Sequence, residues 1–266
     1  MAVDGAVLDE VKRARLAGAR FGRVVELAET TSTNKVAVEE AGRGAPEGLV
    51  VVADYQSAGR GRFDRRWEAP KGKSLLFSVL ARPEPGELPP GGHHLAVGAL
   101  SLALAEAVTE VAGVELALKW PNDLVERRPP ERKVAGLLAE MGAGDAIVIG
   151  AGLNVAWAPE GATCLEELAA RPLERGEILV EALLAFGRLY GQWDEVRDLY
   201  RERCSTLGRE VTVTFSGGPP QVTGTAVDVD ESGRLLLETA GPGGPATVVT
   251  IVAGDVAHAS VGPRVF

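Results

Sequence analysis

Short apolar runs bounded by turn residues alternate with segments of helical periodicity over most of the chain. Runs rich in branched side chains are typical of buried strands, whereas apolar residues repeating every three to four positions indicate helices. The runs predict strands at 24–27, 48–53, 74–81, 115–120, 134–141 and 146–155, the last two forming a hairpin. The periodicity predicts helices at 1–22, 34–41, 93–111 and 178–204. Polar or glycine- and proline-rich stretches at 82–92, 126–132 and 156–176 are expected to be loops or turns.

The pattern changes after Leu207, where the helical period is lost. Strands are predicted at 210–215, 222–228, 235–238 and 247–252, with turns at 217–220, 230–233 and 241–245. About five short strands in some 55 residues are typical of a small β-barrel. We therefore predict two domains, a ligand-binding domain over residues 1–206 and a small β domain over residues 207–266.

The composition is that of an ordinary globular protein, with 266 residues, 45% hydrophobic and 24% charged. A net charge of -9 argues against a surface that binds nucleic acid generally. Cys164 and Cys204 fit no disulfide framework, which favours a reducing cytoplasm. No uninterrupted apolar run approaches the roughly 18 residues of a spanning helix, and the N-terminus lacks the pattern of a secretory signal. We therefore expect a cytoplasmic protein without a membrane partner.

The most informative segment is rich in glycine and arginine. Residues 59–62 are Gly-Arg-Gly-Arg, and four arginines fall within seven residues, followed by Trp67. Glycine lets the backbone approach a ligand, guanidinium groups bind phosphate or carboxylate, and the indole offers a stacking surface. An anion with an aromatic part, such as a nucleotide, satisfies all three. A solvated turn or an RGG-like nucleic-acid segment is the alternative for this stretch taken alone.

Two further motifs place polar side chains at the ends of predicted elements. Residues 32–34, Ser-Thr-Asn, precede a helix and by themselves are typical of a helix cap. Residues 119–124, Lys-Trp-Pro-Asn-Asp-Leu, are predicted to form a turn that projects Asn122 and Asp123 from a strand end. Lys133 stands at the start of the next strand, where it is either a ligand contact or an ordinary surface lysine.

Two familiar kinds of site are not supported. Residues 150–155, Gly-Ala-Gly-Leu-Asn-Val, lack the third glycine and the following helix of a dinucleotide fingerprint. His93, His94 and His258 are too few and too scattered for a His/Cys metal site, although Mg²⁺ held by carboxylates stays open. No metal is therefore predicted from a direct motif.

In order and spacing, these motifs together resemble the bacterial biotin protein ligases (biotin–[acetyl-CoA-carboxylase] ligases). Gln56, the arginine segment, residues 119–124, the Lys-Val-Ala-Gly at 133–136 and residues 150–155 all contribute, as does Ala-Gly-Asp-Val at 253–256. The resemblance covers about residues 24 to 260. It implies an α+β fold with a central mixed β-sheet and helices, similar to class II aminoacyl-tRNA synthetases, and a C-terminal SH3-like β-barrel.

The resemblance also implies a two-step reaction. The biotin carboxylate attacks the α-phosphate of ATP, giving biotinyl-5′-AMP and pyrophosphate, and a lysine of a biotin carboxyl carrier protein or domain then displaces AMP. Two anions meet in the first step, so fixed cations must offset their repulsion. Mg²⁺ on the ATP phosphates is expected to help. No membrane or DNA partner is implied, and a monomer or weak homodimer is expected.

Site residues follow from the positions that match the family motifs. The biotin contacts are expected to be Ser32, Thr33, Asn34, Gln56, Gly59, Arg60, Gly61, Arg62 and Lys133. The ATP and adenylate contacts are expected to be Arg60, Arg62, Arg65, Trp67, Asn122, Lys133 and Asn154. Arg62, Lys133 and Asp123 are predicted to be catalytic.

The sequence departs from the family pattern at one position, and three alternative functions compete with biotin ligation. The family commonly has glycine where Asp64 stands, which leaves the roles of residues 63–66 open. A lipoate-type ligase shares the catalytic fold, but the arginine segment and the C-terminal module favour biotin. A biotin-responsive repressor is disfavoured because about 22 residues precede the first strand, too few for a DNA-binding domain. A binding module without catalysis would not need Lys133 and Asp123 beside an arginine segment.

Overall fold

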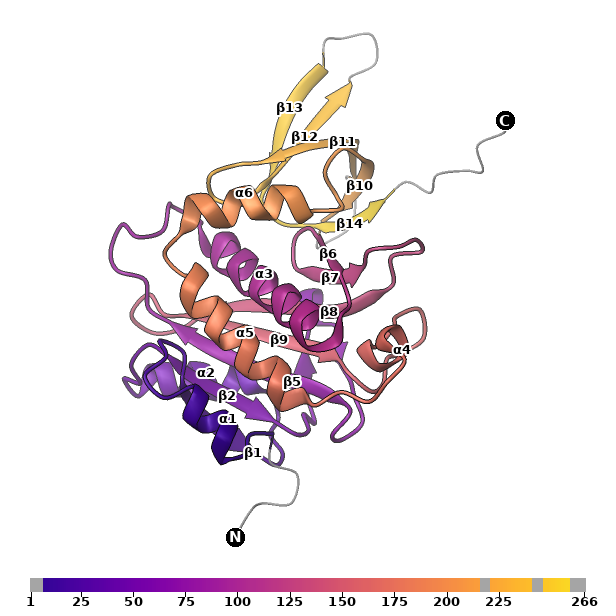
Figure 1. The fold of residues 1–266 in the computed structure, drawn as a ribbon. Helices are drawn as coiled ribbons and strands as arrows, with labels where there is room; N and C mark the ends of the chain where they lie inside the picture. Colours follow the sequence, from indigo (N-terminus) through magenta and orange to yellow (C-terminus); the bar gives the residue numbers. More distant parts are fainter. Residues whose placement is uncertain (1–6, 216–220, 241–245, 259–266) are drawn as a thin grey trace.

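A seven-stranded mixed sheet forms the centre of the structure, a computed structural model that describes residues 7–215, 221–240 and 246–258 (Figure 1). In spatial order its strands are β1 (Arg23–Leu27), β2 (Leu49–Ala53), β5 (Ser74–Ala81), β9 (Ile147–Asn154), β8 (Lys133–Met141), β7 (Asp123–Glu126) and β6 (Leu116–Lys119). β1 and β2 are parallel, and every other neighbouring pair is antiparallel. The predicted central mixed sheet is confirmed.

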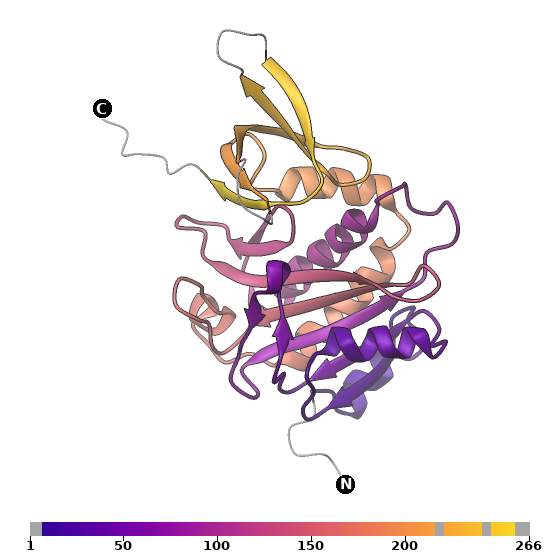
Figure 2. The ribbon, with the colours of Figure 1, turned by 180° about the vertical axis from the view of Figure 1, so that it is seen from behind.

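Helices cover both faces of this sheet. On one face lie α3 (His93–Ala112) and α5 (Arg175–Leu189), which pack on each other, and on the other lies α2 (Thr33–Gly42), seen in front in Figure 2. Because alternate side chains of a strand point to opposite faces, Val50 and Val52 join the α3–α5 core while Leu49 and Val51 pack with α2. This double burial explains the uninterrupted apolar run of β2.

The C-terminal module is a five-stranded antiparallel sheet, as predicted for a small β domain. Its order is β13 (Ala246–Ile251), β12 (Leu235–Ala240), β11 (Val222–Val229), β10 (Glu210–Thr214) and β14 (Asp255–His258). The turn before β12 is confirmed by a hydrogen bond from the Gly233 N–H to the Asp230 carbonyl. The turns predicted at 217–220 and 241–245 lie outside the described residues.

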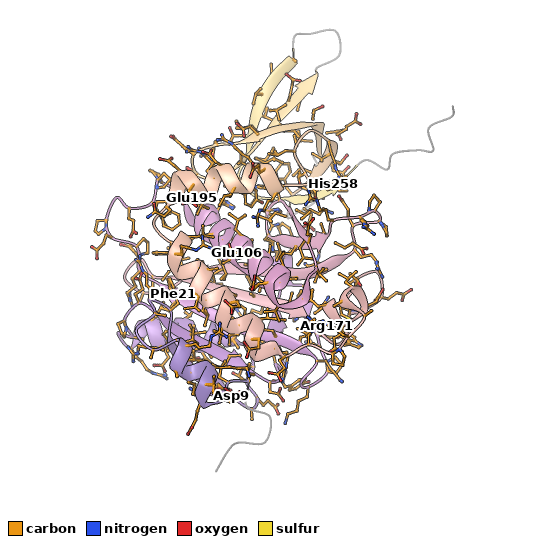
Figure 3. All side chains as sticks on the ribbon, viewed as in Figure 1. Asp9, Phe21, Glu106, Arg171, Glu195 and His258 are labelled. Atoms are coloured by element: carbon orange, nitrogen blue, oxygen red, sulfur yellow. The ribbon has the colours of Figure 1, made fainter. Side chains whose placement is uncertain are left out.

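Polar contacts fasten this module to the larger domain. Arg201, on α6 (Trp193–Arg203), pairs with Asp228 of β11 at 2.6 Å. His258 lies at the junction, where its Nδ1 is 3.1 Å from Glu131 Oε2 (Figure 3). The indole N–H of Trp120 donates to the Gly233 carbonyl at 3.1 Å. The module is therefore held against the end of the sheet that carries β6 and β7.

Several predicted elements differ from those observed. The single helix expected at 178–204 is two helices, α5 and α6, because the chain turns at Gly191 with φ 92°. Residues 1–6 lie outside the described part, and the N-terminal helix is only α1 (Glu10–Arg15). Val11, an apolar residue of this helix, is 71% exposed. Helical periodicity therefore overestimated the length of both segments.

Several short elements were not predicted, among them β7 and α4 (Leu165–Ala169). β7 includes only the first residue of the stretch 126–132 predicted to be a turn, and that residue, Glu126, is buried and pairs with Arg132 at 2.7 Å. The loop expected at 156–176 contains α4. α3 is long and apolar enough to cross a membrane by length and composition, but 78% of its apolar window is buried within the protein. That burial is the property of a core helix.

Candidate active site

β9 and β8 form the floor of a cavity. This part of the sheet lies beyond α2, where no helix covers it. Along β9, Ile149 and Ala151 point into the α3–α5 core, whereas Gly150 and Gly152 face the other way. A Cβ on Gly150 would lie 2.1 Å from Asn34 Oδ1, and one on Gly152 would lie 2.5 Å from Trp67 Cε2. Only glycine fits at these positions, so the glycines of this motif serve the cavity and not a dinucleotide.

The cavity measures about 140 Å³. Most of the predicted site residues line it: Ser32, Thr33, Asn34, Gln56, Arg60, Gly61, Arg62, Arg65, Trp67, Asn122, Asp123 and Lys133. They come from α2, from the segment after β2, from the arginine segment and from the β6–β7–β8 region. The fold thus brings together four motifs that are far apart in the sequence.

One end of the cavity, which we call the neutral end, is a network of amide and hydroxyl groups. The Thr33 N–H and hydroxyl both donate to Gln56 Oε1, at 2.7 and 3.1 Å. Ser78 Oγ, in β5, lies 2.7 Å from Thr33 Oγ1 and 2.6 Å from Asn34 Oδ1. Asn34 Nδ2 donates to Glu140 Oε2 at 2.8 Å. Apart from Gln56 and Glu140 these residues are buried, so each polar group is held by its neighbours.

The first turn of α2 is not capped by the side chain at its N-cap position, as a typical helix cap would be. Ser32 occupies the N-cap position but makes no side-chain capping hydrogen bond. Gln56 accepts the Thr33 N–H instead, which satisfies one of the free donors at a helix start. The Ser32 hydroxyl is therefore not used as a cap, although it lines the cavity.

The arginine segment folds as a small hairpin over the cavity. β3 (Gly59–Arg60) pairs with β4 (Arg66–Trp67), and a 3₁₀ turn over residues 62–64 joins them. A Cβ on Gly59 would lie 2.4 Å from the Trp67 carbonyl oxygen, so the close pairing requires glycine. Phe63 adopts φ 55°, a left-handed conformation unusual for a bulky residue. The side chain of Asp64 lies outside the described part of the chain.

Trp67 lies flat on the cavity floor. A Cβ on Gly152 would lie 2.5 Å from the indole, and one on Gly136 would lie 2.8 Å from Lys133 Nζ and 3.2 Å from the indole. Lys133 Nζ is 5.5 Å from the centre of the indole, within the range of a cation–π interaction. The indole Nε1 is buried and has no hydrogen-bond partner within the described residues. A ligand oxygen near this nitrogen would therefore meet an unused donor.

The other end of the cavity, the charged end, contains ion pairs. Lys133 Nζ lies 2.7 Å from Asp123 Oδ1. Arg62 donates to the Gly254 carbonyl at 3.0 Å and lies 3.8 Å from Asp255 Oδ1, and Arg65 pairs with the same carboxylate. Burial lowers the pKa of the Arg62 guanidinium, while Asp255 and Asp123 oppose that shift. Each carboxylate at this end pairs with a cation, and an anionic ligand would compete with the carboxylate for that cation.

Two predicted residues do not line the cavity. Gly59 lies beneath Trp67 in the hairpin, and Asn154 is buried at the far end of β9. Asn154 Nδ2 donates to the Thr163 carbonyl at 3.2 Å, and its Oδ1 has no partner within the described residues. Asn154 is therefore held by a hydrogen bond within the fold, and its expected ligand contact stays a prediction.

Three residues were not assigned to the site from the sequence. Ser78 is the central hydroxyl of the neutral end, and its signal was a polar residue in the middle of the apolar run 74–81, which begins with another serine. Glu140 binds Asn34 and lies 3.3 Å from Arg60. Asp255 was part of a family motif, but its contact with two loop arginines joins segments with no sequence pattern in common.

Comparisons with known proteins agree with this geometry. Residues 25–154 match the model of the biotin/lipoate A/B protein ligase family, and residues 206–259 match the biotin protein ligase C-terminal domain. The chain is 35% identical over 252 residues to a biotin–[acetyl-CoA-carboxylase] ligase of Mycobacterium tuberculosis, covering 91% of each. It is 33% identical over 236 residues to the bifunctional ligase/repressor BirA of Escherichia coli, covering 83% of this chain and 70% of that protein.

A solved structure is also similar. The biotin protein ligase from Aquifex aeolicus, determined in complex with biotin and ATP, superposes with a TM-score of 0.73 at 28% identity. The match covers 90% of this chain and 99% of that one.

Proposed function

Because the chain belongs to the biotin/lipoate A/B protein ligase family and is a biotin protein ligase, we propose that the cavity forms biotinyl-5′-AMP from biotin and ATP. The biotin is then transferred to a lysine of a biotin carboxyl carrier protein or domain. The observation that carries this proposal is the division of one cavity into a neutral end and a charged end. The two ends match a substrate with a neutral ring at one end and a carboxylate at the other.

The neutral end is proposed to hold the ureido ring of biotin. A buried ureido group needs both donors and acceptors, and each unpaired polar atom costs about 1–3 kcal/mol. Ser32, Thr33, Asn34 and Gln56 offer hydroxyl and amide groups of both kinds on the cavity wall. Backbone groups of Arg60 and Gly61, which line the cavity, complete the proposed biotin site, and Gly59 supports them through the hairpin pairing with Trp67.

The charged end is proposed to carry out adenylation. A carboxylate oxygen of biotin attacks the α-phosphorus of ATP, the new O–P bond forms as the bond to the β-phosphate oxygen breaks, and pyrophosphate leaves with the electron pair. Arg62 and Lys133 offset the repulsion between the two anions and the charge that develops on the phosphate. Arg60, Arg65, Trp67 and Asn122 surround the adenylate in this proposal.

The second step uses the same cations. The neutral amine of the acceptor lysine attacks the biotin carbonyl carbon, and the C–N bond forms as the C–O bond to the phosphate breaks. AMP leaves with the electron pair, and the proton lost by the nitrogen passes to water. Lys133 and Arg62 stabilise the departing phosphate, so both half-reactions depend on them, the first more strongly because it joins two anions.

Mg²⁺ fits this cavity as part of the nucleotide. Within the described residues there is no group of three or more His, Cys, Asp or Glu side chains that could hold a metal. Asp123 and Asp255 each face a cation already. We therefore propose that Mg²⁺ would enter bound to ATP phosphate oxygens and water, and would screen the charge of the phosphates.

Several finer expectations stay proposals. They are a cytoplasmic location, a monomer or weak homodimer, the domain limits 1–206 and 207–266, an adenine or ribose contact by Asn154, and no binding to DNA. The lipoate-type activity that the sequence left open shares the family model of residues 25–154, which covers both ligands. The match of residues 206–259 to a biotin ligase C-terminal domain favours biotin.

The test is a biotin-dependent exchange of labelled pyrophosphate into ATP, catalysed by the purified, folded protein. Exchange is expected with biotin and Mg²⁺, and not with lipoate or without any acid. Exchange with lipoate alone would establish the alternative. No exchange with either acid would remove the proposed adenylation chemistry.

A further inference from the structure

The ion pair between Arg175 and Asp54 lies outside the cavity, and neither residue takes part in the proposed chemistry. Arg175 is the first residue of α5, and Asp54 directly follows β2, two residues before Gln56. Arg175 Nη2 lies 2.7 Å from Asp54 Oδ1, and the two side chains are 17% and 9% exposed. We propose that this pair positions Gln56 for biotin by fixing the start of the segment that carries it, an inference that rests on the proposed function.

The burial of this pair points to a geometric role. Among the ion pairs that arginine and lysine make within the described residues, it is the most deeply buried when both partners are counted. Removing two charges from water is costly, so a buried ion pair often adds little net stability. A guanidinium, however, donates in fixed directions. Arg175 uses two of them, because Nη2 bonds Asp54 and Nη1 donates to the Ser74 carbonyl at the start of β5, 3.1 Å away.

The segment after Asp54 leaves the sheet and depends on such an anchor. Residues 57–58 are exposed, and their N–H groups donate to the carbonyls of residues 30–31, 2.9 Å away. Gln56 lies between this exposed part and Asp54. Its Oε1 accepts the N–H and the hydroxyl of Thr33, so its Nε2 is the group that remains for a ligand. A shift at the start of the segment would therefore move a contact of the neutral end.

The first turn of α5 is itself held from the N-terminal side of the chain. Lys12 of α1, whose side chain is 10% exposed, lies 3.0 Å from Glu174, the residue before Arg175. A Cβ on Gly176 would lie 2.1 Å from the Val7 carbonyl oxygen, so the two backbones are in close contact. α1 contacts α5, as Figure 1 shows. Arg175 therefore projects from a turn that is already fixed, which suits it to position a mobile neighbour.

β2 supplies a matched control, because an ion pair stands near each of its ends. Glu47 precedes the strand and pairs with Arg20 at 2.7 Å, and neither residue lines the cavity. This second pair lies at the end of β2 that is away from Gln56. Loss of either pair can destabilise the fold. Only the loss of the pair at Asp54 should change the binding of biotin.

The experiment compares Arg175→Met with Arg20→Met in the full-length protein. Pyrophosphate exchange gives kcat and the KM for biotin, calorimetric titration without ATP gives the Kd for biotin, and thermal unfolding reports stability. For Arg175→Met, the KM and the Kd should rise about tenfold, as for the loss of one ligand hydrogen bond. Its kcat should stay within about twofold, because the cations of the charged end are untouched. Arg20→Met should leave all three constants within about twofold.

A double variant tests whether Arg175 acts through Gln56. Gln56→Ala alone should raise the KM for biotin, and adding Arg175→Met should raise it less than about twofold further, because two residues that act through one contact are not additive. Asp54→Asn is the milder second variant, since it keeps the shape of the side chain and removes its charge. It should show the same split between KM and kcat if Arg175→Met does not yield folded protein.

A normal KM and Kd for biotin in Arg175→Met and Asp54→Asn would overturn the proposal. An equal rise in Arg20→Met would overturn it as well, because the effect would then follow from general destabilisation. A full additional rise in the Gln56→Ala background would also contradict it, since Arg175 would then act by another route. Failure of the unmodified protein to catalyse exchange is a different result, and it would count against the proposed function itself.

Discussion

The two ends of the ligand cavity are built in opposite ways. At the neutral end, Ser32, Thr33, Asn34 and Ser78 are at most 4% exposed and lie on a helix and a central strand. At the charged end the side chains of Lys133, Asp123 and Asp255 are 38%, 27% and 33% exposed, and they belong to strand ends and to a second domain. The neutral end is fixed by its own hydrogen bonds, whereas the charged end is held by ion pairs.

This difference predicts different consequences of mutation. Buried hydrogen bonds stabilise the fold and position a ligand together, so changes at the neutral end should lower both stability and affinity. Partly exposed ion pairs contribute little to the stability of the fold. Their cations become important for the reaction, when a phosphate with more charge than the paired carboxylate comes to face them. Changes at the charged end should therefore lower the rate of reaction more than the free energy of unfolding.

The largest effect is expected for Lys133→Met at the charged end. This change keeps the length of the side chain, removes its charge and leaves the Asp123 carboxylate facing the phosphates. Pyrophosphate exchange is expected to fall by about 10²–10³-fold, which is typical of losing one fixed group that stabilises transition-state charge. Transfer from preformed biotinyl-5′-AMP should be less impaired.

Lys71→Met is the matched control, because Lys71 is exposed and does not line the cavity. Thermal unfolding of both variants should resemble that of the unmodified protein. Equal losses in the two half-reactions would mean that Lys133 holds the bound adenylate generally. Normal pyrophosphate exchange would mean that Lys133 is an ordinary surface lysine. The predicted difference between the two ends of the cavity would then be wrong.

An intermediate effect is expected for Ser78→Ala at the neutral end. The change removes the hydroxyl that lies between Thr33 and Asn34, and the remaining polar atoms stay buried without it. The free energy of unfolding should fall by about 1–3 kcal/mol. The KM for biotin should rise about twofold to tenfold while kcat changes little, since the ring is held less firmly but the cations are intact.

Ser101→Ala tests whether that split is specific. Ser101 is also buried, and its hydroxyl bonds the Val97 carbonyl within α3 at 2.9 Å, away from the neutral end. We expect a loss of stability without a change in the KM for biotin. A similar rise in KM in both variants would show that the effect follows from general destabilisation and not from the network.

The smallest effect is expected for Glu140→Gln, which acts where the two ends meet. Glu140 binds Asn34 of the neutral end and lies 3.3 Å from the arginine hairpin at Arg60, whose side chain is 57% exposed. An exposed ion pair contributes at most about 1 kcal/mol, so the KM for biotin should rise by no more than about fivefold. Adding the change to Arg60→Ala should have no further effect if the two act as a pair. A full additional rise in the double variant would contradict that link.

Much of the cavity was predictable because its motifs are short and local. The arginine segment and residues 119–124 each combine a turn with polar or charged side chains, and Asn122, Asp123, Lys133 and most of the arginine segment line the cavity. Helix limits were less predictable. The apolar period continues through 178–204 although Gly191 reverses the chain, because both helices pack on the same core.

The sequence by itself determined the strands that alternate their faces, the glycines on the cavity floor and the cluster of cations in an acidic chain. Only the tertiary structure decided which polar groups contact these cavity residues. Ser78 is 44 residues from Asn34, Glu140 is 106 residues from it, and Asp255 is 190 residues from Arg65. Such pairs depend on strand register and on the docking of the second domain, because a polar group is satisfied by whichever partner packing brings within reach. No local pattern records that partner, so the contacts of Ser78, Glu140 and Asp255 emerged only from the folded chain.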